Sequence, residues 1–156
     1  MNVVLIPFFI VLMTYCSPYD DAQSALIALL QSTKNEVLIA VYTINSPEIV
    51  DTLVQLKKNK VDVRIITDST QAAGKHEAEE LAILEKAHIP VYIGKSVDHQ
   101  IMHTKFCVVD DTYVAIGSYN WTDVAQKQDN TLTIEEDPML AKQLHHFWNQ
   151  IKEDLK

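Results

Sequence analysis

Two short runs rich in β-branched side chains restrict the fold of this chain more than any other feature. They are "EVLIAVYT" at residues 36–43 and "VDVRIITD" at residues 61–68. The first run is continuous and apolar, which is typical of a strand that is covered on both faces, and the second predicts the next strand. A helix start lies between them, because Ser46 and Pro47 precede apolar residues at helical spacing. The first half of the chain therefore predicts strands that alternate with helices.

The second half of the chain changes to strands that follow one another directly. Two strand patterns, at 103–109 and 113–119, are separated by Asp110 and Asp111, which favour a tight turn. A further strand is expected at 130–136, followed by a closing helix. This order predicts an α/β sandwich with a mixed β-sheet flanked by helices on both faces.

The apolar N-terminus, residues 1–16, has more than one interpretation. The run from Val3 to Met13 is too short to span a bilayer, and no basic residue precedes it as in a secretory signal. We expect Phe8–Cys16 to form the first strand, with a short membrane-tethering segment as the second interpretation and a cleaved signal as the third. Ser17 is expected to cap the first helix, and residues 17–156 to form a single domain.

Composition excludes several classes of function. The chain has 156 residues, of which 47% are hydrophobic, as suits one globular domain with its own core. It has only three glycines, too few for a Gly-rich phosphate loop or a dinucleotide-binding fingerprint. The formal net charge of −8 gives no general attraction to nucleic acid or to an anionic membrane. A polyanionic substrate would therefore require a local basic site.

One apolar stretch, "HTKFCVVDD" at residues 103–111, carries a histidine and a lysine. On a strand, His103 and Lys105 point to the same face, opposite Phe106. Ser118 and Asn120 form a second pair of this kind in "GSYNWT", residues 117–122. If the two runs form a hairpin, an imidazole, an ammonium, a hydroxyl and a carboxamide converge. Such a set suits nucleophilic attack at phosphorus, with short donors around the anionic oxygens.

These segments resemble the phospholipase D superfamily. "HTKFCVVDD" fits the pattern H-x-K-x-x-x-x-D, and "GSYNWT" is similar to the G-S-x-N-W-T segment of that family. The likeness to its small bacterial nucleases extends over most of the chain, from "YCSPYDDAQSALIALL" to "KQDNTLTI". It implies a phosphodiesterase, first of all a non-specific endonuclease for DNA or RNA, that forms a covalent phosphohistidine without a metal or other cofactor.

The resemblance also implies a role for each motif residue. His103 is the expected nucleophile, and the residues expected to bind the substrate phosphate are Lys105, Ser118 and Asn120. Asp110 completes the catalytic motif, but its odd spacing from His103 predicts a brace behind the site and not a phosphate ligand.

Two further carboxylates lie near predicted strand ends. Asp129 stands where small family members have the carboxylate of an "EN" pair, and it is expected to orient His103. Asp68 is interpreted as a solvated loop carboxylate, with a position at the rim of the site as the alternative.

A single motif in each chain predicts a homodimer. Of the six histidines, only His103 has a lysine two residues later, yet the family chemistry uses two imidazoles at one phosphate. We expect two chains to pair across a two-fold axis with both His103 residues face to face. The face of the strand that carries His103 and Lys105 would then form a floor shared with the second chain.

Two other functions stay open at this point. One is a phospholipase D or cardiolipin-type lipid hydrolase, in which the apolar N-terminus would associate with a membrane. The other is an inactive dimeric module that binds phosphate. The sequence also leaves the compartment open between a bacterial cytoplasm and the cell envelope or periplasm.

Overall fold

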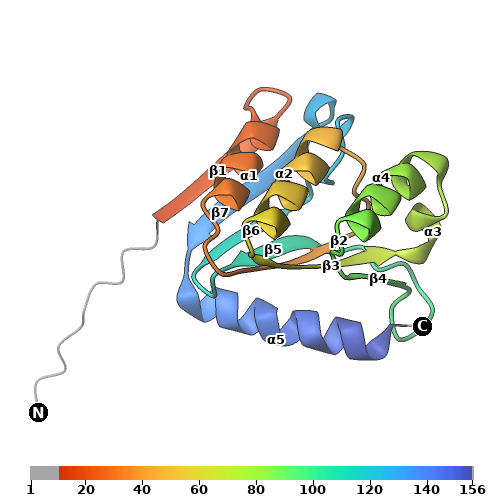
Figure 1. Ribbon diagram of the computed structural model, residues 1–156. Coiled ribbons are helices and arrows are strands. Elements are labelled where there is room, and N and C mark those ends of the chain that lie inside the picture. Colours follow the sequence, from red (N-terminus) through yellow and green to blue (C-terminus); the bar gives the residue numbers. More distant parts are fainter. Residues whose placement is uncertain (1–10, 156) are drawn as a thin grey trace, which may run out of the picture.

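The computed structural model describes residues 11–155 as one mixed seven-stranded sheet between two helical layers (Figure 1). The strand order across the sheet is β1-β7-β6-β5-β2-β3-β4. The strands are β1 (Val11–Ser17), β2 (Glu36–Val41), β3 (Asp62–Asp68), β4 (Val91–Gly94), β5 (Lys105–Val109), β6 (Tyr113–Gly117) and β7 (Asn130–Glu136). β2, β3 and β4 are parallel, and every other neighbouring pair is antiparallel.

The helices are divided unequally between the two faces of the sheet (Figure 1). One face carries α1 (Ala22–Gln31), α2 (Pro47–Lys58), α3 (Ser69–Ala72) and α4 (Lys75–Lys86). The other face carries the long α5 (Pro138–Asp154), and a 3₁₀ turn (Ala125–Lys127) precedes β7. The predicted α/β sandwich with a mixed sheet and helices on both faces is confirmed.

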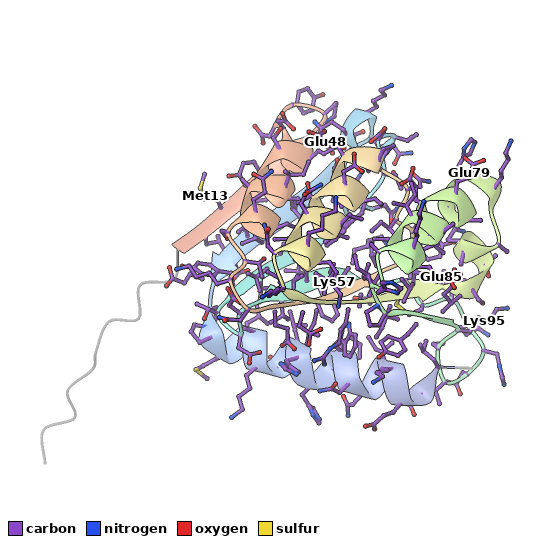
Figure 2. All side chains as sticks on the ribbon, viewed as in Figure 1. Met13, Glu48, Lys57, Glu79, Glu85 and Lys95 are labelled. Carbon is purple, nitrogen blue, oxygen red and sulfur yellow. The ribbon has the colours of Figure 1, made fainter. Side chains whose placement is uncertain are left out.

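The central strand β5 is covered on both faces. Cys107 and Val109 belong to the larger core beneath α1 and α2. Phe106 and Val108 belong to the smaller core beneath α5, where the side chains fill the layer between helix and sheet (Figure 2). The expected floor on the face opposite Phe106 is therefore wrong, because that face is interior to a single chain. Only the N-terminal end of β5 is left to reach solvent.

The edge strand β1 pairs with β7 along its whole length, from Val11 opposite Glu136 to Ser17 opposite Asn130. Met13 is 55% exposed at this edge, where Figure 2 shows it projecting away from the sheet. The tether and signal interpretations concern the apolar segment 1–16, of which residues 1–10 lie outside the described part of the chain and residues 11–16 belong to β1. Within residues 11–155, no helix is both long and apolar enough to cross a membrane.

Two local predictions were wrong. Ser17 does not cap α1, because it is still paired in β1 and its hydroxyl donates to the carbonyls of Ala125 and Gln128. The cap is Asp21, whose carboxylate accepts from the backbone N–H of Ser24. The sequence also predicts a loop from Ser69 to Lys75, but this segment contains α3, a single turn too short to show a periodic pattern.

The turn between β5 and β6 is tied to the start of β2 by Asp110. Its carboxylate accepts backbone N–H bonds from Lys34 (2.8 Å), Asn35 (2.8 Å) and Glu36 (2.9 Å). Burial alone would raise the pKa of Asp110, but these three hydrogen bonds outweigh it and hold the pKa below its ordinary value. Asp110 lies at the end of β5 remote from His103, which agrees with a bracing role and not with contact to a reacting phosphate.

We predict that Asp110→Asn lowers the free energy of unfolding at neutral pH by about 1–2 kcal/mol, because charge-assisted hydrogen bonds to the backbone are lost. Asn tolerates the φ of 50° at this position, so the turn itself is kept. A carboxyl group whose pKa is lowered by folding stabilises the fold at pH values above its pKa in the unfolded chain, which is about 4. That stabilisation is lost as the pH falls through the pKa of the folded protein.

Urea unfolding between neutral and acidic pH measures this effect. The wild type should lose stability on acidification, and the difference from Asp110→Asn should shrink. Asp98→Asn is the control, because Asp98 is exposed and its side chain has no hydrogen bond or ion pair within residues 11–155, and it should leave this pH dependence unchanged. Equal stability of Asp110→Asn and wild type at neutral pH would contradict the bracing role.

Candidate active site

The candidate site lies at one edge of the sheet, at the ends of β2, β3 and β6 and the starts of β5 and β7. β2 and β3 are parallel and finish there, at Val41 and Asp68. β5 is antiparallel to β2 and so starts there, β6 returns to it and ends at Gly117, and β7 leaves from it. The carboxyl ends of parallel strands are the usual binding edge of an open α/β sheet.

His103 and Lys105 stand at the entrance to β5. His103 precedes the strand and is exposed, whereas Lys105 is its first residue and only 7% exposed. The ammonium of Lys105 donates to the carbonyl of His103 at 2.6 Å. Burial lowers the pKa of Lys105. Since no carboxylate pairs with this ammonium in the described chain, an anion in the pocket would meet an uncompensated cation.

Tyr42 is a site residue that the sequence reasoning missed. Its ring lies edge-on to the imidazole of His103, with 4.9 Å between centroids and an angle of 65°. The ammonium of Lys105 is 5.2 Å from the centre of the same ring. Tyr42 directly follows Val41, which is the partner of Lys105 in the β2–β5 ladder. Only that long-range pairing brings the tyrosine here, and it is not visible in the sequence.

The segment after β6 alternates between the core and the site. Tyr119 and Trp121 are each 1% exposed and belong to the larger core. The residues that alternate with them are more accessible: Ser118 is exposed, and Asn120 is half-buried. Ser118 and Asn120 thus lie on the same side of this segment, as predicted. Both residues follow β6, however, and do not belong to it.

Ser118 is oriented by its neighbours on β7. Its hydroxyl donates to Oδ1 of Asn130 at 3.1 Å and accepts from the backbone N–H of Thr131 at 3.0 Å. Oδ1 of Asn120 is buried and has no hydrogen-bond partner among the described residues. The Asn120 carboxamide is therefore uncommitted within one chain, which is unusual for a buried polar group and typical of a binding site.

The four predicted phosphate-site residues line one open pocket of about 590 Å³. Its walls are His103, Thr104, Lys105, Ile116, Gly117, Ser118, Asn120 and Asn130. Asn130 was not predicted as a site residue. An imidazole, an ammonium, a hydroxyl and two carboxamides around one space suit a phosphate ester with anionic oxygens.

Asp129 is not brought to His103 within one chain. Its side chain is exposed and lines a separate shallow pocket with Cys16, Tyr19 and Ser118. No hydrogen bond joins Asp129 to His103 in the part of the chain that the structure describes. The expected orienting contact therefore stays a prediction that a single chain does not provide.

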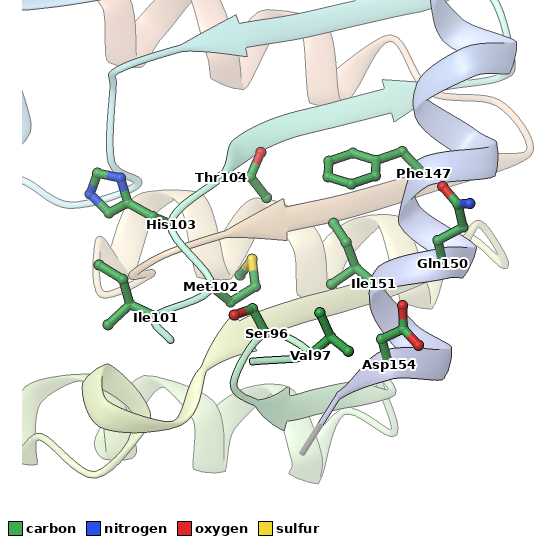
Figure 3. Close-up of a pocket in the computed structure, with 10 residues that line it drawn as sticks. All are labelled: Ser96, Val97, Ile101, Met102, His103, Thr104, Phe147, Gln150, Ile151 and Asp154. Carbon is green, nitrogen blue, oxygen red and sulfur yellow. The ribbon is translucent and has the colours of Figure 1, made fainter. Parts of the chain in front are cut away.

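A second pocket, of about 410 Å³, shares His103 and Thr104 with the first (Figure 3). It lies between the irregular segment 96–104 and the C-terminal half of α5, and its apolar walls are Val97, Ile101, Met102, Phe147 and Ile151. Ser96, Gln150 and Asp154 add polar atoms, and no lysine or arginine lines it.

One cluster within residues 11–155 could hold a metal ion, formed by Glu36, Asp111 and His145. It lies at the opposite end of β5 from His103. Arg64 already pairs with Glu36 at 3.2 Å, and Asp111 contacts His145 at 2.7 Å. The side chains of the cluster thus already contact one another or Arg64, and the cluster does not adjoin the pocket lined by His103 and Lys105.

Comparison with known proteins places this arrangement in a family context. The family described as "Cardiolipin synthase, PLD-like domain" matches residues 26–152. The mitochondrial cardiolipin hydrolase of Xenopus laevis is 31% identical over 136 residues, covering 86% of this chain and 63% of its own length. The chain thus spans less than two thirds of that relative.

Two solved structures share the fold over almost their whole lengths. Nuc from Salmonella typhimurium, described as a phospholipase D family member, has a TM-score of 0.88 and 24% identity, covering 94% of this chain and 97% of its own. NucT from Helicobacter pylori has a TM-score of 0.83 and 22% identity, covering 94% and 98%. At these identities the likeness establishes the fold.

We predict that Gly117→Ala destabilises the protein by about 1–3 kcal/mol, because a Cβ atom at this position meets backbone that cannot rotate away. The added atom would lie 2.1 Å from the carbonyl oxygen of Thr131, which also accepts the N–H of Ser118 at 3.0 Å. The melting temperature and the rate of turnover should therefore both fall. Gly74→Ala, with its nearest contact at 3.0 Å, is the milder control, and an unchanged melting temperature for Gly117→Ala would contradict the close approach.

Proposed function

We propose, since the chain belongs to the family of phospholipase D-like domains, that it is a metal-independent phosphodiesterase with His103 as its nucleophile. The observation that carries this proposal is the single pocket lined by His103, Lys105, Ser118 and Asn120. These are the residues of two sequence motifs, and the fold brings them to one edge of the sheet.

The proposed reaction has two steps. The imidazole of His103 attacks phosphorus, a P–N bond forms, and the P–O bond to the leaving alcohol breaks while a second imidazole gives that oxygen its proton. Water then attacks the phosphohistidine, and the second imidazole takes up its proton. The P–N bond breaks, and a phosphate monoester and free His103 remain. Lys105, Ser118 and Asn120 hold the non-bridging oxygens, on which negative charge develops.

The second imidazole is proposed to come from a second copy of the chain. His103 is the one histidine lining the phosphate pocket in the described chain, and it is exposed, so a partner can approach it. A two-fold axis beside this pocket would bring two histidines and two lysines to one phosphate. The uncommitted carboxamide of Asn120 and the exposed Asp129 would lie near the same interface.

Nucleic acid is the first proposed substrate, with little preference for sequence. A polymeric substrate extends beyond the site on two sides, so the pocket has to be open. His103 and Ser118 are exposed, and the pocket is therefore accessible from solvent. The described chain has no separate recognition domain, so contacts would be made mainly to backbone phosphates, which carry no sequence information. The resemblance of both motifs to small nucleases of the superfamily supports the same choice.

We predict that the protein nicks plasmid and single-stranded DNA in excess EDTA, and that His103→Asn lowers the rate by at least about a thousandfold because the nucleophile is lost. His76→Asn, at an exposed position on α4, is the matched control and should keep the wild-type rate. Gel analysis of plasmid topology measures nicking, and acid-labile ³²P on the protein reports the phosphohistidine. Nicking that requires a divalent metal, or that survives in His103→Asn, would contradict the proposal.

Phospholipid is a second candidate substrate, favoured by the apolar pocket that adjoins His103 (Figure 3). Three of its apolar residues are strongly exposed: Val97 at 55%, Ile101 at 48% and Phe147 at 43%. A pocket without cations, with Asp154 in its wall, suits an acyl chain better than a second backbone phosphate. The relative from Xenopus laevis bears the name of a cardiolipin hydrolase.

If phospholipid is the substrate, Val97→Asp should lower the release of phosphatidic acid from cardiolipin vesicles by about tenfold or more, because a carboxylate would enter the apolar pocket. Turnover of the small diester bis(4-nitrophenyl) phosphate should be unchanged. Ile83→Asp, at a 43% exposed position on α4, is the matched control. No release from vesicles by the wild type, beside active nicking of DNA, would exclude this second substrate.

A further inference from the structure

His103 is carried by an irregular segment and not by the sheet. Residues 95–104 connect β4 to β5, and the regular ladder of β5 starts only at Lys105. The first part of this segment is folded on itself, with the Ser96 N–H donating to the Gln100 carbonyl at 2.9 Å. A nucleophile on such a segment needs an anchor from outside, because its position decides whether attack at phosphorus is in line.

Asp68 provides a direct anchor. One of its carboxylate oxygens, Oδ2, accepts the backbone N–H of Met102 at 2.8 Å, and this hydrogen bond is buried. Met102 is the residue immediately before His103, and its own side chain is 3% exposed in the smaller core. Main chain and side chain of Met102 are therefore both held.

Asp68 itself is rigidly placed. It is the last residue of β3, paired with Gly94, and is 0% exposed, so the expectation of a solvated carboxylate is wrong. Its other oxygen, Oδ1, caps α3 by accepting the N–H of Thr70 at 2.8 Å. The hydroxyl of the preceding Thr67 donates a hydrogen bond to the carboxylate of the buried Glu77 at 2.7 Å. No cation pairs with Asp68 in the described chain, so backbone N–H groups stabilise this buried carboxylate.

The same short helix reaches His103 by a second route. Gln71, in α3, donates from its amide nitrogen to the hydroxyl of Tyr42 at 2.8 Å. The Tyr42 ring in turn contacts the imidazole of His103. The turn after β3 thus contacts the main chain of the His103 segment through Asp68, and the ring of His103 through Gln71 and Tyr42.

We propose that Asp68 is a positioning residue for His103, acting through the backbone N–H of Met102 while Gln71 and Tyr42 fix the imidazole from the side. The role rests on the proposed function of His103 as nucleophile. Capping of α3 requires only one acceptor, which serine also supplies. The second oxygen, directed at Met102, is the part of Asp68 that the cap does not explain.

Asp68→Ser separates the two roles, because it keeps a capping hydroxyl and removes the acceptor for Met102. The test reaction is hydrolysis of bis(4-nitrophenyl) phosphate, which has neither bases nor acyl chains. We expect kcat to fall by about ten- to a hundredfold with KM changed by less than about twofold, because misplacement of the nucleophile affects the reaction more than binding. Asp137→Asn is the matched control, since Asp137 caps α5 with the same kind of bonds, to Met139 and Leu140.

Amide hydrogen exchange followed by NMR gives a readout that is independent of activity. In Asp68→Ser the Met102 amide should exchange faster and the imidazole signals of His103 should shift or broaden, while both stay unchanged in Asp137→Asn. If Asp68→Ser does not fold, Tyr42→Phe, which removes only the hydroxyl that accepts from Gln71, replaces it with the same expected fall in kcat and the same change at His103.

A folded Asp68→Ser protein with wild-type kcat and unchanged Met102 exchange would overturn the proposal, as would an equal loss in Asp137→Asn. If the wild type hydrolyses no phosphodiester at all, the proposed function fails instead. The exchange of Met102 and the imidazole signals of His103 then decide whether Asp68 positions this residue.

Discussion

The pairing of β5 with β2 is the interaction on which the rest of the site depends. It places Lys105 opposite Val41 and so brings the histidine segment beside Tyr42. Because β5 is antiparallel to β2, its start lies at the edge where β2 and β3 end. Without this register, His103 and Lys105 would not lie beside Tyr42, whereas Ser118 and Asn130 reach the same edge through the β5–β6 and β6–β7 pairings.

A second constraint is the cost of keeping a lysine almost buried. Lys105 is 7% exposed, burial lowers its pKa, and its nearest polar contact is a neutral carbonyl. A buried cation without a counter-ion destabilises the free protein, whereas an anionic phosphate in the pocket would supply the missing partner. The proposed phosphate would thus stabilise Lys105, while the overall charge of −8 acts against long polyanions elsewhere on the surface.

Much of the fold was predictable because its signals are local. The runs at 36–43 and 61–68, the Ser46–Pro47 helix start and the turn at Asp110 and Asp111 each carry their own pattern, and together they predicted the sandwich. The odd spacing of Asp110 from His103 also predicted that Asp110 braces the turn. The cover on both faces of β5 was misjudged because His103 and Lys105 suggested an open face, although "KFCVV" contains no alternation.

The remaining features depend on contacts between residues distant in sequence. Strand order brings Asn130 to the pocket and Tyr42 to the ring of His103, and the buried Asp68 accepts a hydrogen bond from a residue 34 positions later. Asp129 was assigned by resemblance, and a single chain leaves it away from His103. A motif identifies the reacting groups more readily than the residues that hold them.

In the proposed function, two copies of His103 act on one phosphate. A crystal structure of the protein grown with orthovanadate, a mimic of the pentacoordinate phosphorus centre, tests this arrangement. We expect one vanadate on a two-fold axis, with imidazole nitrogens of His103 from two chains on opposite sides and Lys105, Ser118 and Asn120 at its equatorial oxygens. A vanadate held by the residues of one chain alone, with no second histidine in contact, would contradict it.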